Sequence, residues 1–355
     1  MSLPIGSQLA VAQPHSLAGI DQSEFGALAE PYRRELNTHC YRMLGSVTEA
    51  EELVQETFLR AWRRRETYQG RAPLRAWLYK IATNACLDSL ERQPRRSLPA
   101  ARQAAASLNE PVPADVTEPI WLEPFPDELI APEEMNPEAR FSMRESVTLA
   151  FMTSLHLLPP RQRAVLILRD VLDWPASEVA SLLGLSVPAV KSALHRARST
   201  LGSHYRAGPA DDFSEQSLDP TRRGLLDRYV RAWEAADVDQ LTALLKAEAT
   251  FSMPPIPAWY RGRDTIGALV SKTVFGGPAG GRWRLRPTRA SGHTGFGLYI
   301  RDEAGGHRAY GIQVVTLEGE EVADIITFRS PELFRFFGLP AAWPSESGIA
   351  NRTGA

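Results

Sequence analysis

Apolar residues along this chain of 355 residues follow two different periods. From Glu24 to about Arg96, and again from about Phe141 to Tyr205, they recur at three- and four-residue intervals, which predicts amphipathic helices. After Asp219, two more helices are expected, followed by residues that alternate between apolar and polar as half-buried strands do. Helices followed by a meander of strands predict a separate α+β domain. Its expected helices are Leu225–Ala236 and Val238–Leu245, and its expected strands are Ala249–Met253, Trp283–Thr288, Gly297–Arg301, Arg308–Glu318 and Glu321–Arg329.

Charge is segregated along the chain, although the formal net charge is only -2. Ten basic residues stand against three acidic ones between Arg60 and Arg96, and residues 186–206 hold four basic residues and no acidic one. Between these blocks, residues 97–140 carry nine acidic and two basic residues and are rich in Pro and Ala. Because charges act together only within a Debye length, the basic blocks indicate nucleic-acid contacts. The acidic stretch indicates a linker, of which Trp121–Pro126 is apolar enough that we expect it to dock.

Two helix starts carry sequence signals of their own. Ser46 with Glu49 fits a capping box at the start of one helix in the first helical stretch. A helix-turn-helix is predicted between Pro175 and Leu201, because Gly184 ends a short helix and Ser186 can cap the next. Pro188 is tolerated in the first turn of this second helix. Its outward side chains have the spacing of a recognition helix in a DNA major groove, although a helical hairpin with solvated charges is the alternative. These outward side chains are Lys191, Ser192, His195 and Arg196.

Three ordered motifs surround this helix-turn-helix. Glu49–Trp62 reads EAEELVQETFLRAW, Leu74–Asp88 reads LRAWLYKIATNACLD, and Leu157–Leu166 reads LLPPRQRAVL. Together they resemble the sigma-70 family, specifically its extracytoplasmic-function (ECF) branch. In that resemblance the first motif is the clamp-binding region 2.2, the second is regions 2.3 and 2.4 that open and read the −10 element, and the third belongs to region 4, which reads the −35 element.

The resemblance implies an RNA polymerase sigma factor whose partners are promoter DNA and the β′ clamp helices and β flap of core RNA polymerase. For the clamp-binding face the alternative is an ordinary solvated helix face. The acidic linker, which in the family threads the polymerase cleft, is alternatively a passive tether. The expected core-polymerase contacts are Glu52, Gln55, Glu56, Leu59 and Trp62. The expected −10 contacts are Tyr68, Gln69, Arg71, Arg75, Lys80 and Asn84. The expected −35 contacts are Ser186, Pro188, Lys191, Ser192, His195 and Arg196.

Residues 219–340 resemble SnoaL-like members of the nuclear transport factor 2-like fold, on Leu226–Leu245 and the strand segments after it. In sigma factors with this extension, the domain modulates sigma activity. The fold implies a cone whose apolar pocket can hold a small ligand. His293 with Asp264 could transfer protons there, although aromatic residues in a small cone are more often core. The candidate pocket residues are Trp259, Tyr260, Trp283, His293, Tyr299 and Tyr310.

The expected fold is therefore multidomain: two all-α helical sigma domains (a region 2 bundle and a region 4 helix-turn-helix) and a C-terminal α+β cone-shaped domain. Cys40 and Cys86 lie in helical patterns without metal-ligand spacing, which suits a reducing cytosol. We expect no catalytic residue, metal or cofactor. Met1–Ile20 does not resemble a secretory signal, and no apolar run approaches the ~20 residues of a membrane helix, so a soluble cytoplasmic protein is expected. The expected boundaries are a flexible leader (1–23), region 2 (24–96), the acidic linker (97–140), region 4 (141–206), a second linker (207–218), the SnoaL-like domain (219–340) and a flexible tail (341–355).

Three functions fit parts of this pattern. The first is a sigma factor, the second a duplex-binding regulator that uses only its helix-turn-helix, and the third a SnoaL-like enzyme with a DNA-binding appendage. A plain regulator needs neither a clamp-binding helix nor a melting region, so the block from Glu49 to Asp88 favours the sigma factor.

Overall fold

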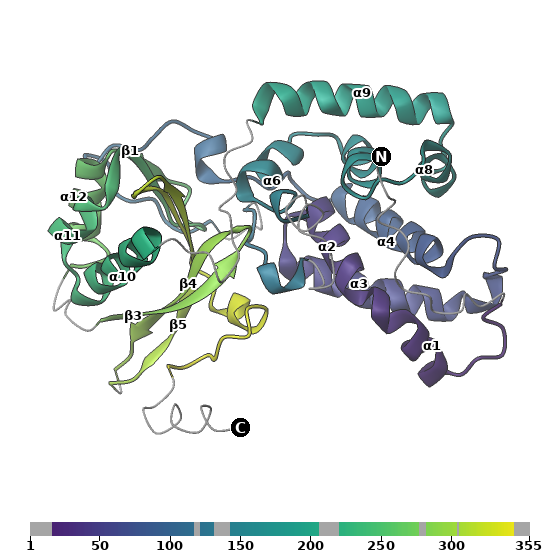
Figure 1. The fold of residues 1–355 in the computed structure, drawn as a ribbon, viewed down its shortest axis with the longest axis horizontal. Helices are drawn as coiled ribbons and strands as arrows, with labels where there is room; N and C mark the ends of the chain where they lie inside the picture. Colours follow the sequence, from purple (N-terminus) through teal and green to yellow (C-terminus); the bar gives the residue numbers. More distant parts are fainter. Residues whose placement is uncertain are drawn as a thin grey trace. The chain divides into compact units, whose positions relative to one another are not determined.

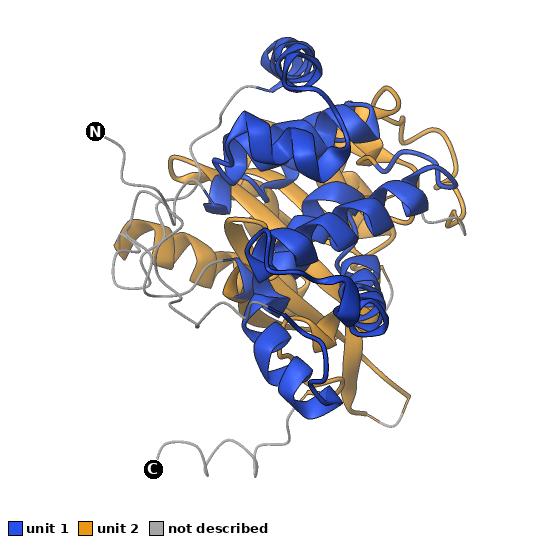
Figure 2. Ribbon diagram, turned by 90° about the vertical axis from the view of Figure 1, so that its right-hand side faces the viewer, with its two compact units in different colours: residues 1–96, 129–208 blue, residues 97–128, 209–355 orange. Residues whose placement is uncertain are grey.

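The computed structural model describes residues 16–116, 121–130, 143–205, 220–276, 282–303 and 305–343. The expected linker at 207–218 lies outside these residues, as do most of the leader and tail and parts of the acidic linker. The chain forms two compact units, the first from residues 1–96 and 129–208 and the second from residues 97–128 and 209–355 (Figure 2). Regions 2 and 4 therefore share one unit, and the larger part of the acidic linker belongs to the other.

Region 2 is a bundle of four helices in the first unit. Ser46 caps the third of them by accepting a hydrogen bond from the Glu49 amide at 3.1 Å. The Glu49 carboxylate, predicted to return the bond to the cap, instead accepts from Arg96 at 2.5 Å. Gly45 ends the second helix in the left-handed region, at φ 74°. The helices are α1 (Gln22–Ala29), α2 (Arg33–Leu44), α3 (Val47–Arg63) and α4 (Leu74–Leu90), with short 3₁₀ turns at Glu30–Tyr32 and Arg65–Thr67.

Region 4 contains the predicted helix-turn-helix. Gly184 ends its first helix at φ 64°, and Ser186 caps its second by accepting from the Ala189 amide at 3.3 Å. Both local signals in the sequence are thus confirmed. The helices are α6 (Leu149–Leu155), α7 (Pro160–Leu166) with a π-helical turn at Ile167–Val171, α8 (Ala176–Leu183) and α9 (Val187–His204).

Regions 2 and 4 share a buried interior within the first unit. The Arg163 side chain, 1% exposed, donates to the backbone oxygen of Met43 at 2.5 Å. Trp174, which precedes α8, packs its ring against Tyr79 of α4 with centroids 5.1 Å apart. The first contact joins α7 to α2, and the second joins the start of the helix-turn-helix to α4, the helix expected to read the −10 element.

The second unit is built on a six-stranded mixed sheet in the order β2-β1-β6-β5-β4-β3 (Figure 1). The β1–β6 pair is parallel, and the other neighbours are antiparallel. Helices α10 and α12 cover one face with an apolar core, so the predicted fold class is confirmed. The sequence prediction missed the short strand β2 and helix α12. The elements are α10 (Pro220–Ala235), α11 (Val238–Ala243), β1 (Leu245–Ser252), β2 (Trp259–Arg261), α12 (Arg263–Lys272), β3 (Trp283–Ala290), β4 (His293–Arg301), β5 (His307–Glu318), β6 (Glu321–Phe328) and a 3₁₀ turn, η6 (Pro331–Arg335).

Described residues of the acidic linker between 97 and 128 contact this sheet domain. Phe125 is fully buried and exchanges two hydrogen bonds with Ser291 in the turn between β3 and β4, at 2.7 and 3.0 Å. The Asp127 carboxylate accepts from the Gly292 amide at 2.8 Å. The expected docking of Trp121–Pro126 therefore occurs. The alternative of a passive tether is wrong for this part, because its apolar side chains and backbone groups have partners in the second unit.

Candidate functional site

The recognition helix α9 presents a basic outer face. Val190, Ala193, Leu194 and Ala197 are buried on its inner side. Because these positions recur with helical spacing, the remaining positions face solvent. Arg198 is also exposed, but it forms an ion pair with Asp170 at 2.7 Å. All six expected −35 contacts are exposed, namely Ser186, Pro188, Lys191, Ser192, His195 and Arg196.

The expected polymerase-binding residues lie along α3. Leu59 is 48% exposed, a large apolar side chain left in solvent beside the exposed Glu52 and Gln55. Glu56 is partly engaged, because its carboxylate accepts from Arg60 at 2.7 Å. Trp62 is half-buried, and the Arg65 guanidinium lies 3.9 Å from its ring centroid. The face thus combines free acidic and amide groups with an exposed leucine.

Four of the six expected −10 contacts are exposed. Lys80 and Asn84 lie one turn apart on α4, and Gln69 and Arg71 lie in the loop before it. These two cations and two amides are suitable partners for the phosphates and the hydrogen-bonding edge of an unpaired base.

The other two expected −10 contacts are engaged inside the first unit. The Tyr68 ring is 4% exposed, packs against Trp77 at 5.3 Å and donates its hydroxyl to the Ala72 oxygen at 2.9 Å. Arg75 donates to the Glu35 carboxylate from Nε at 3.0 and 2.9 Å and from Nη2 at 2.7 Å. Its guanidinium also lies 5.5 Å from the Trp174 ring centroid. The Tyr68 ring is therefore enclosed within the first unit, whereas the Arg75 side chain is held by Glu35 but remains 34% exposed.

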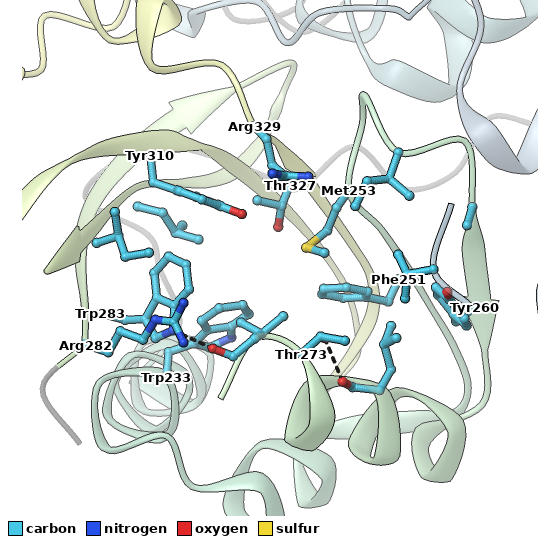
Figure 3. A pocket seen from close by; sticks show the side chains of 17 residues that line it. Trp233, Phe251, Met253, Tyr260, Thr273, Arg282, Trp283, Tyr310, Thr327 and Arg329 are labelled. Atoms are coloured by element: carbon cyan, nitrogen blue, oxygen red, sulfur yellow. Dashed lines mark hydrogen bonds between the residues drawn. The ribbon is translucent and has the colours of Figure 1, made fainter. Parts of the chain in front are cut away.

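The second unit contains a cavity of about 330 Å³ between the sheet and helices α10 and α12. Figure 3 shows aromatic side chains around it, with the Arg329 guanidinium at its rim. Of the candidate pocket residues, Tyr260, Trp283 and Tyr310 line this cavity. The sequence analysis missed Arg282, Arg329 and Val112, which line it as well.

The other three candidates do not line the cavity. On β4, Leu298 and Ile300 face the cavity, so Tyr299 between them points to the opposite face, where it packs against Phe334 of η6 with centroids 5.1 Å apart. His293, six residues before Tyr299, is on that same opposite side of the pleat. Trp259 precedes the lining Tyr260 and donates its Nε1 to the backbone oxygen of Gln103 at 2.8 Å.

The structure gives no support to the alternative in which His293 and Asp264 form a proton-transfer pair in the cavity. A carboxylate whose charge interacts with His293 is Asp324 on β6. Asp264 lies in the first turn of α12. Burial raises the pKa of Asp324 to about 6, opposed by a hydrogen bond from Thr250 and by His293. Side chains alternate between the two faces of the sheet, so knowing how β3 pairs with β4 would have placed His293 and Trp283 on different faces. That pairing cannot be read from the sequence alone.

Within the part of the chain that the structure describes, no group of three or more His, Cys, Asp or Glu could hold a metal ion. In the same residues, no helix is long and apolar enough to cross a membrane.

Comparisons with known proteins match all three parts of the chain. The family Sigma-70 region 2 matches residues 28–96, Sigma-70 region 4 matches residues 148–201, and the SnoaL-like domain family matches residues 226–329. ECF RNA polymerase sigma factor SigG of Mycobacterium tuberculosis (strain H37Rv) is 44% identical over 324 residues, covering 90% of this chain and 85% of that protein. SigW of Bacillus subtilis (strain 168) is 27% identical over 187 residues, covering 52% of this chain and 91% of that protein.

A solved structure has the same overall architecture. The crystal structure of the M. tuberculosis extracytoplasmic function sigma factor SigJ matches with a TM-score of 0.53 at 24% identity, covering 90% of this chain and all of that one. The fold thus agrees with the sequence relationship. The chain belongs to the extracytoplasmic-function family of RNA polymerase sigma factors and carries a SnoaL-like C-terminal domain.

Proposed function

We propose that this sigma factor, which directs promoter-specific transcription initiation, divides its contacts among three exposed surfaces. α3 contacts the β′ clamp helices of core polymerase, α4 with the loop before it contacts the −10 element, and α9 contacts the −35 element. Region 4 also contacts the β flap. The observation that carries the proposal is the exposed face of α9, which has Lys191 and Arg196 at major-groove spacing and no acidic residue.

Base reading by α9 is supported by the contrast among its cations. Lys191 and Arg196 are exposed and able to reach base edges or phosphates. Arg198 on the same helix is held by Asp170 at 2.7 Å. The first two therefore supply sequence-dependent affinity, whereas Arg198 supplies only local structure.

Promoter opening is assigned to the exposed side of α4. Asn84 can hydrogen-bond an unpaired base, and Lys80 can contact a phosphate. On α3, Leu59 offers an apolar contact beside the exposed Glu52 and Gln55.

Use of both DNA elements requires regions 2 and 4 to separate. The elements are centred about 25 base pairs apart, about 85 Å of duplex at ~3.4 Å per base pair. Regions joined through Arg163 and Trp174 form one compact unit, so we infer that these contacts open on promoter binding.

The C-terminal domain modulates this activity and is assigned no catalysis, because His293 lies on the face of the sheet opposite the cavity. A small ligand in the cavity is part of the proposal. We place the protein in the cytoplasm, where core polymerase and promoters are.

Run-off transcription with core polymerase on a promoter pool tests the proposal. The full chain is compared with versions that end near Tyr205 and near Arg329. Promoter-specific transcripts are expected, with a change on truncation. Duplex binding without any specific transcript would contradict the proposal and favour a plain regulator.

Point variants test the division of contacts. Lys191→Ala and Arg196→Ala are each expected to weaken −35 binding by ~1–3 kcal/mol, with Arg198→Ala as the matched control that leaves promoter discrimination unchanged. Asn84→Ala is expected to slow opening and spare duplex binding. Equal losses in all three α9 variants would mean that only overall charge matters, which would overturn the assigned reading face.

A further inference from the structure

Residues 103–116 of the acidic linker, here called the strap, run along the C-terminal domain beside the cavity. At its start, the backbone oxygen of Gln103 accepts from Trp259 Nε1 at 2.8 Å, and the Ala106 amide donates to the Trp259 oxygen at 2.8 Å. At its end, the Val116 amide donates to the Pro255 oxygen at 3.2 Å. Between these anchors Val112 lines the cavity. The strap is therefore one wall of the cavity, supplied by the chain that connects regions 2 and 4.

The strap is held far less firmly than the linker segment after it. Val112 is 40% exposed, and the Asp115 side chain is 50% exposed. Phe125, by contrast, is fully buried. Because little apolar surface is buried between residues 109 and 115, this part can leave the domain without unpacking its core.

An ion pair joins the strap to Arg329 at the edge of the cavity. Arg329 Nη1 donates to Asp115 Oδ1 at 2.8 Å, and Arg329 also lines the cavity. The Nε of Arg329 is buried and has no hydrogen-bond partner among the described residues. The guanidinium thus keeps a donor besides the Nη1 group that now holds the Asp115 carboxylate.

The cavity walls favour a flat apolar body. Trp233, Trp283, Phe251 and Tyr310 surround the hollow, and Figure 3 shows the Tyr310 hydroxyl and the Arg329 guanidinium directed toward it. No acidic residue is among the described residues that line it. Its volume of about 330 Å³ is at the small end of ligand sites, which span roughly 300–1,000 Å³. Aromatic walls with a cation at the rim are suited to a small aromatic acid.

We propose that the cavity binds a small aromatic carboxylic acid whose carboxylate replaces Asp115 on Arg329 and so releases the strap. Ligand binding is thereby coupled to the linker between the two promoter-reading regions. The effect on transcription rests on the proposed function, but the binding site and strap release do not.

Two probes of the same shape test the site in the full chain without polymerase or DNA. 2-Naphthoate is an anion at pH 7.5, and 2-naphthamide is its neutral counterpart. Calorimetric titration is expected to show naphthoate binding at least roughly tenfold tighter, the gain expected from a charge-assisted hydrogen bond. Hydrogen exchange of the Val116 amide is expected to accelerate when naphthoate is bound. Equal binding of both probes, or no binding, would overturn the proposed ligand class.

Variants of the strap provide the sharper test, because they change exposed side chains. Asp115→Asn removes the competing carboxylate and is expected to tighten naphthoate binding several-fold and to speed Val116 exchange without ligand. Glu110→Gln is the matched control, since it makes the same charge change on the same strap away from Arg329. Arg329→Gln is expected to abolish the preference for naphthoate over naphthamide. Indistinguishable results for Asp115→Asn and Glu110→Gln, or unchanged Val116 exchange on binding, would refute strap release whatever the transcription assay gives.

Discussion

Gly184 provides a quantitative test of how the sequence builds the helix-turn-helix. It ends α8 at φ 64°, a conformation that costs an L-residue roughly 1–2 kcal/mol. A Cβ placed on Gly184 would meet no atom within 4 Å, so the cost of Gly184→Ala is conformational alone. Alanine also lowers the conformational entropy of the unfolded chain, which offsets ~0.4–1 kcal/mol of this cost. The expected net destabilisation is about 1 kcal/mol.

Gly202 is the matched control on the next helix. It lies within α9, and a Cβ there would also meet nothing within 4 Å. Because its backbone is helical, Gly202→Ala is expected to stabilise the helix by ~0.5–1 kcal/mol. The same substitution in the same region is thus expected to act with opposite signs.

Hydrogen exchange in the full chain measures both effects. Unfolding of a multidomain chain is not two-state, so local opening free energies of α8 and α9 amides are more informative than a single melting curve. The Leu185 amide, which donates to the Ala180 oxygen at 2.9 Å, reports the turn directly. A gain in protection for Gly184→Ala, or a shift of the same sign in both variants, would refute the reasoning.

Three further predictions follow from buried groups. Burial lowers the pKa of His39 to about 3, helped by Arg42 and Arg75, so its stabilising contribution is complete above pH 6.5 and is lost as pH falls toward 3. Hydrogen exchange of region 2 amides should therefore show their opening free energy falling by about 1 kcal/mol per pH unit between pH 6.5 and 5, and a His39→Gln variant with the same slope would contradict this. Burial raises the pKa of Asp324 to about 6, so its contribution is complete below pH 3.8 and is lost as pH rises through 6. Asp324→Asn should be the more stable protein in melts at pH 7.5 but not at pH 4, and an equal difference at both would count against it. Trp174→Ala should cost ~3–5 kcal/mol of region 2–region 4 packing and raise exchange at the start of α8, and unchanged exchange there would show that Trp174 does not hold the two regions together.

The sequence by itself determined the local elements and the family. The turn at Gly184 and the cap at Ser186 depend only on chain neighbours, and the periods of three to four and of two identified most helices and strands. The motifs from Glu49 to Asp88 separated a sigma factor from a plain regulator, and the comparisons confirmed that assignment.

Only the tertiary structure decided which residues meet across long stretches of chain. Asp115 and Arg329 are 214 positions apart, and no periodicity relates them. Arg75 was expected to read DNA, but Glu35 and Trp174 engage it from elsewhere in the first unit. Strand register placed His293 and Tyr299 on the face opposite the cavity. The pattern of apolar residues shows which face of a helix or strand is buried, but not which segment covers that face. Packing of the whole unit decides the covering segment, and in the second unit part of the acidic linker forms a wall of the cavity.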